Sequence, residues 1–196
     1  MRFFAILLAA GLSERFGCEN KLLAPFRGKP LARHAVDLAL GFACFEQIFL
    51  VYSDERVAAL ADGSRITAIF NQSPEKGPGE SARLGVAAAG GLGNDPAFYL
   101  FLPCDKPLLN AESVSLLLAA ARPGFIAEAG KNGSPCLFSA SFRDEILSLK
   151  PGEQPRLIKR RHPQSVITVD AAEPAILEDV NTPEDLIRLE KLNSRR

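Results

Sequence analysis

The sequence predicts a single-domain α/β protein with three layers, in which helices cover both faces of a mostly parallel sheet. Short apolar runs alternate with amphipathic helical stretches along the first 130 residues. The length of 196 residues suits one domain, and the 47% of hydrophobic residues can bury a sizeable core. No internal repeat or linker interrupts the chain. We therefore expect one domain over residues 1–196, with a regular half at 1–130 and an elaboration at 131–196.

Near-continuous apolar runs predict the buried strands of this sheet. They cover residues 3–8, 47–52, 66–70, 97–102 and 124–127. The apolar run at the N-terminus is not expected to be a signal peptide, because a single arginine precedes it and a functional-looking loop follows it.

Helices are expected between these strands, over residues 30–40, 54–61, 79–89 and 110–121. Pro30 suits a first helical position, Asp54 and Asn110 suit N-caps, and Gly90-Gly91 makes a stop. Because strand and helix alternate, the strands are expected to be parallel, with ligands at their carboxyl ends.

The second half is less regular. Residues 133–135 lead into a short strand, 139–150 and 156–161 are expected to be helical, and 165–169 forms a strand. Thr182-Pro183-Glu184-Asp185 begins a terminal helix by a capping pattern.

A loop of small and charged residues follows the first predicted strand. Its residues include Ala9, Ala10, Gly11, Leu12, Ser13, Arg15, Gly17 and Lys21. A buried strand that runs into such a loop presents backbone N–H groups to an anion, and Arg15 and Lys21 supply countercharge. Neither Gly-x-Gly-x-x-Gly nor a P-loop is present. Taken alone, a strand-end turn without a ligand is the alternative, but the later motif 104–107 favours a phosphate site.

Asp105 is the candidate magnesium ligand. The buried run 97–102 delivers it to the carboxyl end of a strand, and Mg²⁺ takes one or two carboxylates and completes its shell with water and phosphate oxygens. A cap or turn is the alternative role. Asp179 is a candidate second metal ligand, although its segment is also typical of a turn before a helix.

The breaker-rich loop 74–83 contains two candidate nucleoside contacts, Gly79 and Ser81. We expect Ser81 to begin a helix there, and the loop backbone with the Ser81 hydroxyl to contact a base edge or a ribose. Such loops also occur without a ligand.

Charge and cysteine content limit the function. The 23 basic residues balance 23 acidic ones, so no global field favours nucleic acid or a membrane surface. Residues 1–33 carry six basic and two acidic side chains, which favours a small anionic ligand. The four cysteines form no Cys-x-x-Cys pair, which predicts reduced thiols in a cytoplasmic protein.

Several segments carry a family resemblance: residues 8–23, 28–31, 102–107, 133–138 and 179–186. They resemble the nucleotidyltransferases that attach a nucleotide to the molybdenum cofactor, and the cytidylyltransferase branch in particular. The resemblance covers nearly the whole chain and implies a Rossmann-like sheet of the nucleotide-diphospho-sugar transferase type. Two departures stand out: Gly152-Glu153-Gln154-Pro155-Arg156 replaces a Gly-Asp and Gly-Ala-Arg pattern, and Asn181 stands where Asp is common.

The resemblance implies CTP and the molybdenum-pterin cofactor as substrates, with a recipient molybdoenzyme or its chaperone as a further partner. Ala9-Ala10 favours CTP, since the guanylyl branch usually has Gly at the second position. The expected reaction is attack of the acceptor phosphate on the α-phosphorus, with pyrophosphate leaving and Mg²⁺ as cofactor. Arg15, Lys21 and Asp105 are the expected catalytic residues.

A phosphate acceptor needs no protein nucleophile, and we expect both His34 and His162 to be structural or exposed. The expected acceptor site comprises Gly133, Ser134, Pro135, Arg156 and Lys159. For the basic cluster 156–161, a solvated helix face is an equal alternative.

Two other functions remain open from the sequence. One is a cytidylyltransferase for another small phosphorylated acceptor, against which the missing arm segment and the C-terminal motifs argue. The other is a non-enzymatic carrier of the cofactor, against which the set of Arg15, Lys21 and Asp105 argues.

Overall fold

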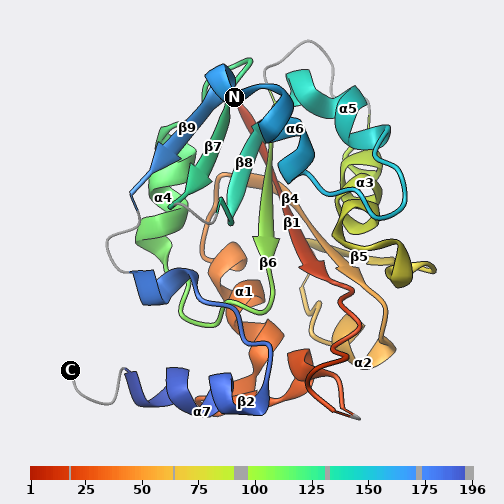
Figure 1. The fold of residues 1–196 in the computed structure, drawn as a ribbon, viewed down its shortest axis with the longest axis vertical. Coiled ribbons are helices and arrows are strands. Elements are labelled where there is room, and N and C mark those ends of the chain that lie inside the picture. Colours follow the sequence, from red (N-terminus) through yellow and green to blue (C-terminus); the bar gives the residue numbers. More distant parts are fainter. Residues whose placement is uncertain (18, 64, 91–96, 131–132, 171–173, 193–196) are drawn as a thin grey trace.

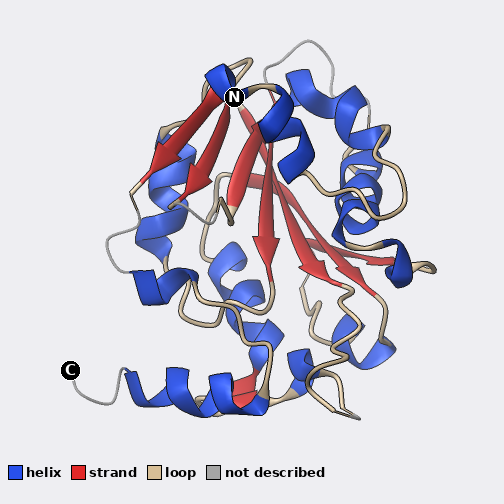
Figure 2. Cartoon of the chain, viewed as in Figure 1, coloured by secondary structure: helices blue, strands red, loops and turns tan. Residues whose placement is uncertain are grey.

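A seven-stranded sheet forms the centre of the molecule in the computed structural model, which describes residues 1–17, 19–63, 65–90, 97–130, 133–170 and 174–192 (Figures 1 and 2). Its strand order is β5-β4-β1-β6-β8-β7-β9. The strands are β1 (Arg2–Ala9), β4 (Phe45–Tyr52), β5 (Ile66–Phe70), β6 (Ala97–Pro103), β7 (Ile126–Ala129), β8 (Cys136–Ser139) and β9 (Val166–Val169).

The sheet is mostly parallel, as predicted. β1 pairs in parallel with β4 and β6, and β4 pairs in parallel with β5. β8 is antiparallel to both β6 and β7, while β9 is parallel to β7. Because the carboxyl ends of β1, β4 and β6 lie at one edge, the loops that follow them converge there.

Helices cover both faces of the sheet. They are α1 (Leu31–Leu40), α2 (Glu55–Ala58), α3 (Pro78–Ala88), α4 (Ala111–Ala119), α5 (Arg143–Leu147), α6 (Arg156–Arg161) and α7 (Pro183–Leu192). One apolar cluster joins the sheet to α1, α4 and α7, and the other joins it to α3, α5 and α6. Alternate residues of β1 divide between them: Leu7 packs in the first and Ile6 in the second. The three-layer prediction is therefore confirmed.

Most element boundaries agree with the prediction to within two residues, with four differences. Pro30 is not the first helical residue: it ends the short strand β3 (Lys29–Pro30), which pairs with β2 (Pro25–Phe26), and acts as the N-cap of α1. α2 covers only part of 54–61. The expected helix 139–150 is a 3₁₀ turn (Ala140–Phe142) followed by α5. α3 begins at Pro78, so Ser81 lies within its first turn rather than at its start.

Capping predictions hold where the structure describes them. Asp54 and Asn110 cap α2 and α4 through their side chains. Thr182 and Asp185 cap α7 reciprocally: Thr182 N donates to Asp185 Oδ2 at 3.0 Å, and Asp185 N donates to Thr182 Oγ1 at 3.3 Å. Gly91 and Cys18 lie outside the described residues. Among the residues described, no helix is long and apolar enough to cross a membrane.

Candidate active site

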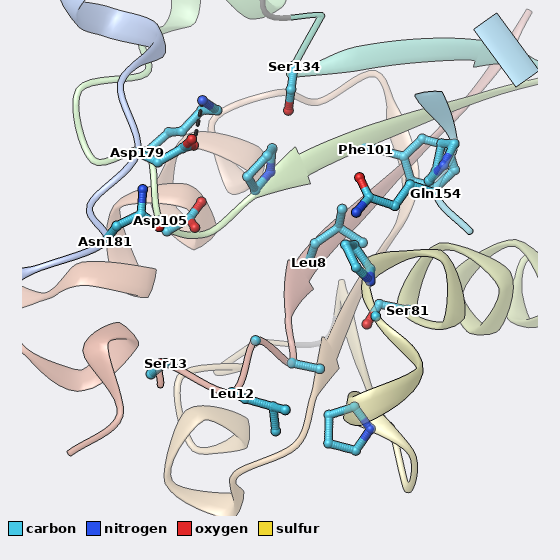
Figure 3. A pocket seen from close by; sticks show the side chains of 18 of the residues that line it. Leu8, Leu12, Ser13, Ser81, Phe101, Asp105, Ser134, Gln154, Asp179 and Asn181 are labelled. Carbon is cyan, nitrogen blue, oxygen red and sulfur yellow. Dashed lines mark ion pairs between the residues drawn. The ribbon is translucent and has the colours of Figure 1, made fainter. Parts of the chain in front are cut away.

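A cavity of about 680 Å³ opens at the carboxyl ends of β1 and β6 (Figure 3). It is lined by the predicted residues Ala10, Gly11, Leu12, Ser13, Arg15, Lys21, Ser81, Asp105, Gly133, Ser134, Arg156, Lys159 and Asp179. Three other predicted site residues are buried and do not line it: Ala9, Gly79 and Pro135. The cavity therefore brings the two predicted halves of the site together.

The loop after β1 has an ordered backbone. Ser13 has a positive φ of 55°, its carbonyl accepts from Phe16 N at 2.8 Å, and its Oγ accepts from Lys21 N at 3.3 Å. Among the described residues, the backbone amides of Gly11 and Leu12 have no acceptor. Both residues are exposed at the cavity, so these amides can donate to phosphate oxygens.

Lys21 and Asp105 form an ion pair. Lys21 Nζ lies 2.8 Å from Asp105 Oδ2 and 2.8 Å from the Val180 carbonyl. Both side chains were predicted at the site, but their mutual pairing was not. Both side chains line the cavity, where an ammonium group can pair with a phosphate and a carboxylate can ligate a metal ion.

The second candidate carboxylate, Asp179, pairs with a lysine that sequence reasoning missed. Lys106 Nζ lies 2.6 Å from Asp179 Oδ1 and also donates to the Leu177 carbonyl. Figure 3 shows Asp179 beside Asp105 and Asn181 at one side of the cavity. A lysine directly after an aspartate at the end of a buried strand is a signal that could have indicated Lys106.

Arg15 contacts Asn181. Arg15 Nη2 donates to Asn181 Oδ1 at 3.0 Å, so the loop after β1 reaches the segment before α7. Arg15 is exposed and lines the cavity, so its guanidinium can reach an anion bound there.

Ser81 lines the cavity, and a neighbouring side chain orients its hydroxyl. Asn71 Nδ2 donates to Ser81 Oγ at 3.1 Å, and Ser73 N donates to Asn71 Oδ1 at 2.9 Å. Asn71 is only 1% exposed. Asn71 was not predicted from the sequence, although a polar residue directly after a strand could have indicated it.

Gly79 has a packing role in place of the predicted nucleoside contact. A Cβ on Gly79 would lie 2.2 Å from the Glu153 carbonyl oxygen. The absence of a side chain therefore lets the backbone at 153–154 approach α3, which brings Gln154 to the cavity.

The expected acceptor residues behave differently from one another. Lys159 Nζ donates to Glu128 Oε2 and to the Gly133 carbonyl, each at 2.6 Å. Arg156, one turn earlier in α6, is exposed at the cavity and has no charged or hydrogen-bonding partner among the described residues. Arg156 is thus available to an anion, whereas Lys159 holds the turn before β8.

Neither His34 nor His162 is among the residues that line the cavity. His34 Nε2 contacts the Phe26 carbonyl at 2.9 Å, and burial lowers its pKa. His162 contacts Glu145 at 2.7 Å. Cys136 does line the cavity, but burial raises the pKa of its thiol to about 11, so the thiol stays protonated near neutral pH.

Comparison with known proteins shows the family of the chain. Residues 5–166 match the family model described as the MobA-like NTP transferase domain. The chain belongs to this family. A protein named nicotine blue oxidoreductase, from Paenarthrobacter nicotinovorans, is 30% identical over 94% of both chains. A molybdenum cofactor guanylyltransferase from Shewanella woodyi is 27% identical over 94% of this chain and 93% of its own.

A solved structure has the same fold as this chain. A nucleotidyl transferase from Methanothermobacter thermautotroptrophicus superposes with a TM-score of 0.84 at 21% identity, covering 99% of this chain and 98% of its own. The matched family region includes the loop after β1, Asp105 and α6. Membership of the MobA-like family therefore supports nucleotidyltransferase activity at the cavity described above.

Proposed function

We propose that this protein transfers CMP from CTP to the phosphate of the molybdenum-pterin cofactor and releases pyrophosphate. The observation that carries the proposal is the cavity that combines free loop amides, two cations and the Asp105 carboxylate at the ends of β1 and β6. Family membership and the resemblance to cytidylyltransferases support the same chemistry.

Charge repulsion is the main obstacle to this reaction, because both substrates are anions. The amides of Gly11 and Leu12, with Arg15 and Lys21, face the space where a triphosphate can bind. Fixed donors of this kind stabilise the charge that moves to pyrophosphate as the bond to the α-phosphorus breaks. The acceptor phosphate is itself the nucleophile, so the protein needs no activated side chain.

Magnesium is the proposed cofactor, and Asp105 is its proposed protein ligand. The donor set fits: one carboxylate oxygen at the cavity, with the remaining positions left to phosphates and water, is what Mg²⁺ accepts. Among the described residues, no group of three or more His, Cys, Asp or Glu side chains is placed to hold a metal ion by itself. When bound, the ion neutralises phosphate charge.

The acceptor is proposed to bind between β8 and α6. Gly133 and Ser134 line the cavity on one side, and Arg156, which has no partner among the described residues, lines it on the other. We propose that Arg156 binds the acceptor phosphate, since a guanidinium pairs with phosphate through two parallel hydrogen bonds.

We also propose that the methyl group of Ala10 favours cytidine over guanosine, because Ala10 lines the cavity and leaves less room for a purine. Ala10→Gly is then expected to narrow the preference for CTP over GTP in competition experiments. A preference of the unmodified protein for GTP would contradict this assignment.

The three described cysteines are free, which supports a reducing, cytoplasmic environment. We further propose that the product passes to a molybdoenzyme or its chaperone.

Pyrophosphate release with each of the four nucleotides, with and without the pterin cofactor, tests the proposal. We expect release with CTP only when the pterin is present. Release with another phosphorylated acceptor instead would show a different cytidylyltransferase. Tight pterin binding without any release would show a carrier.

A further inference from the structure

Lys106 is the most deeply buried charged side chain at the cavity, with only 3% of its side chain exposed. Its ammonium group has two partners, the Asp179 carboxylate at 2.6 Å and the Leu177 carbonyl. A buried ammonium is stable only when such partners compensate its lost hydration. Asp179, by contrast, has a side chain that is 47% exposed.

Lys21 connects the same two parts of the chain at the neighbouring residues. It joins Asp105 to the Val180 carbonyl, and Val180 N donates to the Asp105 carbonyl at 2.8 Å. The backbone of 177–180 is therefore held against the end of β6 by two lysines and one backbone hydrogen bond. This segment continues to Asn181, which accepts from Arg15.

The two aspartates differ in what holds them. Lys21 lines the space proposed for the triphosphate, so its ammonium group can bind a phosphate in place of the Asp105 carboxylate. Lys106 has both of its described partners on the segment 177–179, so releasing Asp179 would leave its ammonium with a single carbonyl. Lys106 therefore needs Asp179 as its counter-ion, whereas Lys21 can release Asp105 when a phosphate binds.

We propose that Lys106 is a positioning residue for the transfer reaction: it fixes Asp179 as its counter-ion, so that Asp179 supports the segment 177–181 and Asp105 is the carboxylate that ligates the metal. The inference rests on the proposed function, because it concerns the metal of that site. In this proposal Asp179 is the counter-ion of Lys106 and is not a second metal ligand.

Mn²⁺ binding at saturating CTP, followed by electron paramagnetic resonance, tests this division of roles. We expect Asp105→Asn to weaken Mn²⁺ binding about 10-fold or more and Asp179→Asn to change it less than about threefold. Lys106→Met should tighten Mn²⁺ binding or add a second ion, because it frees the Asp179 carboxylate. Lys29→Met is the matched control, since it breaks a lysine–aspartate pair with Asp37 that does not line the cavity.

Equal weakening by Asp105→Asn and Asp179→Asn would overturn the inference. Absence of Mn²⁺ binding to the unmodified protein with CTP would instead contradict the proposed function.

A double-mutant cycle without CTP or metal then decides whether the pair exists. We expect Lys106→Met to lower the melting temperature by about 5 °C or more, and the double variant Lys106→Met/Asp179→Asn to lower it no further. Additive losses would show that Lys106 does not hold Asp179.

Discussion

Asp105 is the residue on which the proposed chemistry depends most. It lies at the carboxyl end of β6, pairs with Lys21 and lines the cavity. Asp105→Asn keeps the size of the side chain but removes its charge, so turnover should fall on the order of 100-fold or more while the fold is retained. Steady-state pyrophosphate release measures the loss.

Asp62→Asn is a suitable control for this variant, because Asp62 pairs with Arg33 and does not line the cavity. Near-normal turnover of Asp105→Asn at saturating Mg²⁺ would remove Asp105 from the mechanism.

Gly79 is a residue whose surroundings leave no room for a side chain. Gly79→Ala should lower the free energy of unfolding by about 1–3 kcal/mol, because the new methyl group would meet the Glu153 carbonyl at 2.2 Å. Gly11→Ala is the matched control, since a Cβ there has no neighbour within 4 Å in the part of the chain that the structure describes. Denaturant unfolding compares the two. Equal stabilities would show that the backbone at 153–154 moves away freely.

The charged residues of the cavity were predictable from the sequence, but the partners of these residues were not. Lys21 and Asp105 were recognisable because each follows a buried strand, and small anionic ligands need such groups. Their ion pair was not predictable, since it joins residues 84 positions apart through a shared sheet edge. Lys159 was assigned to the acceptor by its charge, whereas the structure pairs it with Glu128, which gave no sequence signal of its own.

At the scale of elements, α6 contains two kinds of basic side chain. Arg156 lines the cavity, while Arg160 is exposed and lies outside it. Arg156→Gln should therefore raise the KM for the acceptor about 10-fold or more and leave the KM for CTP nearly unchanged, because a charge-assisted hydrogen bond to one substrate is lost.

Arg160→Gln on the same helix should leave both constants unchanged. If Arg156→Gln raises both KM values equally, the two substrates share Arg156, and the acceptor site has been wrongly separated from the nucleotide site.

Elements with strong local signals were predicted well. Buried apolar runs located β1, β4, β5 and β6, and side-chain caps located α2, α4 and α7. The short elements of the second half were harder, because α5 has only five residues and depends on tertiary packing of Phe142 and Ile146 in the second core cluster.

At the scale of the whole molecule, the sheet brings distant segments to one edge. β8 is antiparallel to both of its neighbours, so Gly133 and Ser134, which directly precede it, lie at this edge and line the cavity. The strand–helix alternation predicted this edge as the ligand site, but the antiparallel placement of β8 depends on pairing between residues far apart and left no local pattern.

The transfer of a nucleotidyl group across this edge is the central claim, and isotope tracing tests it most directly. CTP labelled at the α-phosphorus and CTP labelled at the γ-phosphorus are incubated in parallel with the pterin cofactor and Mg²⁺. The α-label should appear in the pterin product and the γ-label in pyrophosphate, because the acceptor attacks the α-phosphorus. Appearance of the γ-label in the pterin, or of neither label, would contradict nucleotidyl transfer by this cavity.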